Sequence, residues 1–218
     1  MTSEPAQDAT AQHVQTPRQR RNLMVLGLAG GVGLATLLIA LATLLLTGTA
    51  AAGPASVSAR VAAPGVVKST RISADCVDTQ YKDQGREHTQ NLGAKIAYNS
   101  YPPTSGTHFY DPARWGNYPT QVSLVQEIHN LEHGGIVIQY GDRVPAADRD
   151  KLNAYYDKDP VGILMAPLPR IGTRIAVTAW THLMVCQKVD TKAFDTFKKK
   201  YRFKGPEKIP ADQMQPGQ

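Results

Sequence analysis

Histidine is the residue type whose spacing in this sequence points most directly to chemistry. Four of the six histidines lie in the middle of the chain, at His88, His108, His129 and His133. The last two belong to the run HNLEHGG, and in a helix residues four apart lie on one face. Imidazole is a good ligand for zinc and for copper. The spacing therefore predicts a transition-metal site, for zinc or copper, with these four histidines as ligands.

Polar residues next to the histidines are expected to support them. Glu132 could be a further ligand, orient a ring or act as a general base. The run PPTSGTH is expected to position His108. Thr104 and Ser105 are expected to contact the ligand side chains without binding the metal themselves. In the alternative, the histidines only cap turns and satisfy buried backbone groups. Three or more ring nitrogens that converge on one point would favour the metal, whereas histidines bonded individually to separate backbone carbonyls would favour the metal-free cluster.

Two patterns raise the possibility of a hydrolase. The letters HNLEH match the H-x-x-E-H motif of inverted zinc peptidases, but Gly134 and Gly135 break the helix at once, and Glu207 is the only later glutamate. Ser105 with a histidine and an acid could form a nucleophilic triad, yet the chain has no G-x-S-x-G turn. The sequence favours a binding protein over an enzyme and keeps a metal-dependent hydrolase as an alternative.

Cys76 and Cys186 are the only cysteines in the chain. An even cysteine count in an exported chain predicts a disulfide, and closing so long a loop stabilises a fold by roughly 4 to 5 kcal/mol. The alternative is two free thiols. Period-two alternation along THLMVCQ places Cys186 on one face with His182 and Met184, a set of soft donors suited to copper.

An uncharged run from Leu23 to Leu46 is long enough to cross a bilayer as a helix. Three arginines lie just before it, and no lysine or arginine follows until Arg60. This bias predicts a cytoplasmic N-terminus and an extracytoplasmic C-terminal part. A cleaved signal peptide, cut within residues 49–59, is the alternative, but its apolar region is normally shorter. We expect a single-pass protein of the cell membrane.

The domain plan follows from composition and periodicity. We expect a cytoplasmic disordered tail at 1–22, a transmembrane helix at 23–47, a linker at 48–74, an extracytoplasmic domain at 75–210 and a disordered tail at 211–218.

Inside the domain, residues 99–120 are rich in proline and aromatic side chains and predict an ordered loop. Hydrophobic patterns predict strands at 135–140, 163–168, 174–180 and 181–187, a helix at 145–157 and a last helix that follows an Asp190 cap. The fold class is therefore α+β, one compact domain with a small, mainly antiparallel sheet and packed helices.

Several runs together resemble the DUF3105 family. They are YNSYPPTSGTHF, ARWGNY, IHNLEHGGIVIQY, AWTHLMVC and FKKKYRFKGPE, and they extend from about His88 to Glu207. The resemblance implies a mostly bacterial, often membrane-anchored extracytoplasmic protein of unknown function. The matching positions include the four clustered histidines and Glu132, so the resemblance adds weight to a shared polar or metal site.

Charge excludes one further class of function. The formal net charge is +6, but the lysines and arginines are scattered, and no basic stripe or nucleic-acid motif is present. We expect no nucleic-acid partner. The membrane itself and a membrane protein are the expected partners. The leading function is metal binding at the cell envelope, and the alternative is a metal-free interaction domain or accessory subunit of a membrane complex.

Overall fold

The computed structural model describes residues 64–218. The predicted tail at 1–22 and the predicted membrane helix at 23–47 lie outside this range. Within residues 64–218, no helix is both long enough and apolar enough to cross a bilayer.

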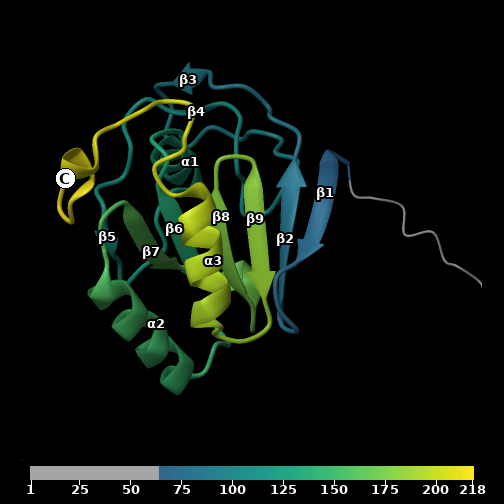
Figure 1. The fold of residues 1–218 in the computed structure, drawn as a ribbon. Helices are drawn as coiled ribbons and strands as arrows, with labels where there is room; N and C mark the ends of the chain where they lie inside the picture. Colours follow the sequence, from purple (N-terminus) through teal and green to yellow (C-terminus); the bar gives the residue numbers. More distant parts are fainter. Residues whose placement is uncertain (1–63) are drawn as a thin grey trace, which may run out of the picture. The chain divides into compact units, whose positions relative to one another are not determined.

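A seven-stranded sheet forms the centre of the domain, in the order β1-β2-β9-β8-β6-β7-β5 (Figure 1). Neighbours from β1 to β6 pair antiparallel, while β7 pairs parallel with both β6 and β5. The strands are β1 (Val66–Arg71), β2 (Cys76–Tyr81), β5 (Gly116–Asn117), β6 (Ile136–Tyr140), β7 (Ile163–Pro167), β8 (Ile175–Ala179) and β9 (His182–Cys186). The predicted α+β class with a mainly antiparallel sheet is confirmed.

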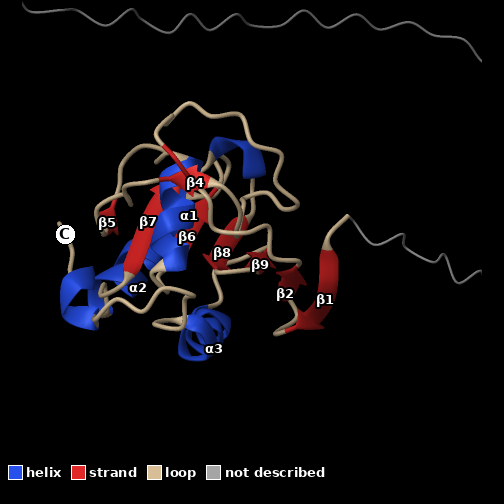
Figure 2. Cartoon of the chain, turned by 90° about the horizontal axis from the view of Figure 1, so that it is seen from above, coloured by secondary structure: helices blue, strands red, loops and turns tan. Residues whose placement is uncertain are grey.

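The helices cover both faces of this sheet. Figure 2 shows α1 on one face and α3 on the other. The bounds are α1 (Leu124–Glu132), α2 (Ala146–Lys158), α3 (Thr191–Tyr201) and the 3-10 turns η1 (Pro169–Ile171) and η2 (Ala211–Met214). Alternation along β6 explains the layers, because Ile136 and Ile138 pack with the α2 and α3 side chains and Val137 packs with Leu131 of α1.

The predicted elements of the C-terminal half lie within two residues of those observed. The Asp190 cap is confirmed, since its side chain accepts a hydrogen bond from Ala193 N–H at 3.0 Å. The apolar stripe of the last helix is also as predicted, with Phe194 and Phe197 buried against the sheet. The proline-rich segment at 99–120 is a loop apart from short strand pairings.

Both predicted ends of the domain need correction. Residues 66–71, assigned to the linker at 48–74, form β1 and pair with β2. This edge strand is mostly exposed, so its sequence carries no hydrophobic signal. The predicted disordered tail at 211–218 is ordered, because Met214 is fully buried and Gly217 N–H donates to the Trp115 carbonyl at 2.8 Å. One buried side chain and backbone hydrogen bonds leave no pattern in the sequence.

The predicted disulfide is confirmed. Cys76 and Cys186 are bonded to each other and lie directly opposite in the register of β2 and β9. Because both cysteines are in the disulfide and Met184 is buried in the core, the soft-donor alternative on β9 has no free thiolate.

Replacing both Cys76 and Cys186 by alanine should lower the free energy of unfolding by about 2 to 5 kcal/mol. The reason is that the disulfide restricts the unfolded chain over a loop of 110 residues. Urea denaturation monitored by circular dichroism measures the loss. A reductant should cause the same loss in the wild-type protein and none in the variant, and equal stability of the two oxidised proteins would contradict the prediction.

A buried carboxylate ties the sheet to α3. Asp78 of β2 accepts hydrogen bonds from His182 Nδ1 at 3.2 Å and from the Tyr201 hydroxyl at 2.7 Å, and Lys200 Nζ lies 3.8 Å away. Burial acts to raise the pKa of Asp78, but the bonds from His182 and Tyr201 and the nearby positive charges outweigh burial and hold this pKa below its ordinary value. His182 therefore has a structural partner of its own.

The lowered pKa of Asp78 predicts a loss of stability in acid. The ionised group stabilises the fold above the unfolded pKa of about 3.9, and that contribution disappears as the pH falls through the lower folded value. Thermal unfolding of the wild type and of Asp78→Asn between pH 7 and pH 2 checks this. The difference between the two should be largest at neutral pH and shrink below about pH 4. For the control Asp142→Asn, at an exposed position, the difference in thermal unfolding from the wild type should not shrink in this way as the pH falls.

Candidate metal centre

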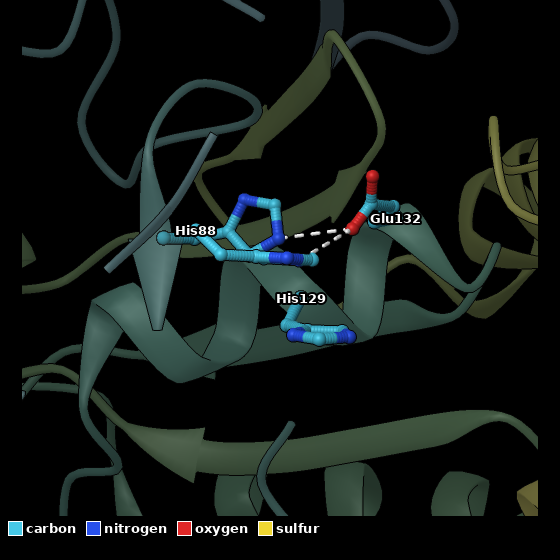
Figure 3. Close-up of side chains that lie close together, drawn as sticks. His88, His129 and Glu132 are labelled. Atoms are coloured by element: carbon cyan, nitrogen blue, oxygen red, sulfur yellow. Dashed lines mark hydrogen bonds and ion pairs between the residues drawn. The ribbon is translucent and has the colours of Figure 1, made fainter. Parts of the chain in front are cut away.

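The histidine cluster forms where two loop segments meet the C-terminal end of α1. The short strands β3 (His88–Thr89) and β4 (His108–Phe109) pair parallel, which places His88 directly opposite His108. Figure 3 shows His129 and Glu132 on α1, with His88 beside them and a dashed contact between His88 and Glu132. Segments far apart in the sequence thus bring imidazoles to one carboxylate.

His108 is fully buried and held at both ring nitrogens. Its Nδ1 lies 2.8 Å from the Gly106 carbonyl, which can only accept, so Nδ1–H donates. In a neutral ring, Nε2 then carries a lone pair. This Nε2 lies 2.9 Å from Oε2 of Glu132. Two acceptors at that distance require a proton or another cation between them.

His129 repeats this arrangement. Its Nδ1–H donates to the Phe109 carbonyl at 2.9 Å, and its Nε2 lies 3.0 Å from Nε2 of His133. Burial lowers the pKa of His129 more than the Phe109 carbonyl raises it, and burial together with the charge of His129 lowers the pKa of His133. The lowered pKa values favour neutral rings, the form in which imidazole binds a metal.

Glu132 is the carboxylate at the centre of the cluster. Its side chain is 5% exposed, and besides the 2.9 Å contact with His108 it lies 3.4 Å from His88 Nε2 and 3.9 Å from Arg86 Nε. Glu132 is also the last residue of α1, where the helix dipole disfavours an anion and favours a cation. A buried carboxylate in this place needs positive charge close to it.

The structure sorts the predicted ligands into two adjoining groups. In the first, donor atoms of His88, His108, His129 and Glu132 all lie within 4.8 Å of one another. In the second, the same holds for His129, His133 and Glu207. His129 belongs to both. Three of the four predicted histidines thus gather with Glu132, whose carboxylate could hold a metal with them, while His133 lies beside them with Glu207.

Glu207 reaches the cluster because the chain after α3 crosses the end of α1. Phe203 N–H donates to the Gly134 carbonyl at 2.7 Å, and Glu207 N–H donates to the Glu132 carbonyl at 3.0 Å. Gly134 has a φ of +83°, and a Cβ atom there would lie 2.6 Å from the backbone nitrogen of Gly205. Glycine at this position ends the helix and lets the crossing segment approach. The sequence singled out Glu207 only as the one later glutamate for the peptidase motif, and no spacing relates it to the histidines, so its place beside His133 was not predicted.

Thr104 and Ser105 do not take the supporting role predicted for them. Both are buried, but Thr104 Oγ1 lies 3.3 Å from Ser100 Oγ, and Ser105 Oγ accepts from Gln84 N–H at 3.1 Å. These bonds shape the loop before His108 and touch no histidine, so they give no support to a serine triad. The carbonyls of residues 106 and 109 orient the rings instead, and a backbone carbonyl leaves no signature in a sequence.

A buried asparagine fastens the aromatic loop to α1. Asn130 Oδ1 accepts from Ala113 N–H at 3.0 Å, and Asn130 Nδ2 donates to the Ala113 carbonyl at 2.8 Å. This two-point clamp lies next to His129 in the sequence. It fixes the loop that supplies His108 against the helix that supplies His129 and Glu132.

Comparison with known proteins gives a family and no described activity. No curated protein and no solved structure matches this chain. The family model of DUF3105, described as a protein of unknown function, matches residues 88–213, which is more than half of the 218 residues. The matched range begins at His88 and includes both groups of ligand residues, and on this evidence the chain belongs to the DUF3105 family.

Proposed function

We propose that this protein binds a transition-metal ion, zinc or copper, through the first group of the cluster. The observation that carries the proposal is the pair of rings that donate Nδ1–H to backbone carbonyls, His108 to Gly106 and His129 to Phe109. Histidines that ligate metals usually bond their second nitrogen in this way, which fixes the tautomer and directs Nε2 toward the ion.

The donor set and its surroundings suit such an ion. Three imidazoles and one carboxylate are donors that zinc accepts, and copper also binds imidazole well. A cation between His108 Nε2 and Glu132 Oε2 would remove the conflict between two acceptors 2.9 Å apart. It would also add positive charge to that of Arg86 beside the buried carboxylate, at the negative end of α1.

The metal-free alternative places a proton where the ion would be. A protonated His108 would donate to Glu132, and the cluster would then be part of an interaction domain. Two observations were expected to separate these functions, and both occur in the same rings. The Nδ1 atoms of His108 and His129 bond to separate backbone carbonyls, while their Nε2 atoms face other side chains of the cluster. Because ligand histidines show this combination, it favours the metal.

We further propose that the domain lies outside the cell, anchored by the uncharged run from Leu23 to Leu46. The three arginines before the run support this orientation, and the disulfide of Cys76 and Cys186 suits an oxidising compartment. The function would then be metal handling next to the membrane, with a membrane protein as partner. The open sides of the cluster, at the half-exposed His88, are where a partner could deliver or accept the ion.

Full-length protein, purified in detergent without a histidine tag or chelator, should contain at least one equivalent of zinc or copper. Substituting His88→Ala or Glu132→Gln should weaken metal affinity by more than about tenfold, because each removes a donor from the group. Elemental analysis by mass spectrometry and a competitive chelator titration measure content and affinity. Added metal should also raise the midpoint of thermal unfolding of the wild type.

His182→Gln is the matched control, because this histidine lies outside the cluster and contacts Asp78. Its metal content should equal that of the wild type. Wild-type protein that holds no metal even after loading with zinc or copper would refute the proposed function, and the metal-free interaction domain would take its place.

A further inference from the structure

We propose that the cluster holds two metal ions side by side. The inference rests on the proposed function and extends it. The first ion is bound by His88, His108 and Glu132. The second is bound by His129, His133 and Glu207, and His129 belongs to this second position when both ions are present.

Contact distances divide the six side chains into two trios. In the first trio, Glu132 Oε2 lies 2.9 Å from His108 Nε2 and 3.4 Å from His88 Nε2. In the second trio, His133 Nε2 lies 3.0 Å from His129 Nε2 and 3.3 Å from Glu207 Oε2. Each hydrogen bond or ion pair among these six side chains joins two members of the same trio, and none joins the first trio to the second.

The trios touch each other through their rings. The His129 ring stacks on that of His88 with centroids 5.0 Å apart, and it meets the His108 ring edge to face at the same separation. Two ions bound by the two trios would therefore be neighbours in one centre. Both positions also lie at the C-terminal end of α1, where the helix dipole attracts cations.

Each trio is a complete donor set by itself. Two imidazoles and one carboxylate bind catalytic zinc and other divalent ions of the first transition row, and they leave coordination positions open. His129 cannot serve both ions at once, because its Nδ1–H donates to the Phe109 carbonyl and only Nε2 is free. With two ions bound, the partition into trios gives three donors to each ion.

Charge and exposure indicate what completes the centre. The positive charge of two divalent ions exceeds the negative charge of Glu132 and Glu207, and Arg86 adds a further positive charge 3.9 Å from Glu132. An anion is therefore needed beside the ions, and hydroxide from water is the simplest. The side chains of His88 and Glu207 are each 48% exposed, so solvent reaches the cluster from both trios.

Zinc stoichiometry of the full-length protein tests the second position. Elemental analysis after zinc loading and removal of free ion should give two equivalents for the wild type. Glu207→Gln and His133→Ala should each reduce the content to one, because each takes one of three donors from the second trio. Glu87→Gln removes another exposed carboxylate near the cluster and should leave two equivalents.

Electron paramagnetic resonance tests whether the ions are neighbours. Protein loaded with Cu(II) should give a half-field signal from two coupled copper ions, and Glu207→Gln should abolish that signal. Circular dichroism of each variant verifies the fold, which Glu207→Gln should leave intact because this side chain is half exposed.

The outcomes separate this inference from the proposed function. One zinc equivalent in the wild type, unchanged by Glu207→Gln, would overturn the second position and leave single-metal binding standing. Two equivalents in every variant, without coupling between copper ions, would place the second ion elsewhere and also overturn the inference. Absence of metal from the wild type would refute both.

Discussion

A carboxylate buried at the negative end of a helix is the constraint on which the rest of the candidate site depends. Glu132 is shielded from water on the last turn of α1, where the peptide dipoles oppose its charge. Such a group is tolerated only beside positive charge. The chain surrounds it with imidazoles from β3, β4 and α1, and backbone carbonyls hold the rings of His108 and His129 so that Nε2 of each faces the cluster. The local geometry is thus organised around compensating one charge.

The sheet separates this chemistry from the packing that stabilises the domain. On the α2 and α3 face, aromatic and aliphatic side chains form the larger core, with the disulfide and the Asp78 bonds fastening the same strands and helix. On the α1 face, a smaller core around Trp115 and Leu131 supports loops instead of further helices. Loops supported by a rigid sheet can present functional groups without providing the stability of the fold.

The sequence predicted most of the regular structure, because β-branched strands and an amphipathic helix carry strong periodic signals. The last helix, which follows the Asp190 cap, is an example, and the disulfide was predictable from the cysteine count. The edge strand β1 gave no such signal, since an exposed strand depends on pairing with β2. At the site, the histidines were predictable from residue type and spacing. Glu207 and the carbonyls of Gly106 and Phe109 were not, because tertiary contacts alone bring them there.

The strand order affects the stage of folding at which the histidine cluster is completed. Near the centre of the sheet, β9 pairs with β2, and the paired residues Cys76 and Cys186 are 110 positions apart. Domains built on such distant pairings fold slowly, on the order of milliseconds to seconds. The chain must lose the entropy of closing long loops before the stabilising contacts between the paired strands form. Glu207 lies after β9 and α3 in the chain, and its segment crosses the end of α1. We therefore expect the cluster to be completed late in folding, so that a metal would enter a finished domain instead of guiding its assembly.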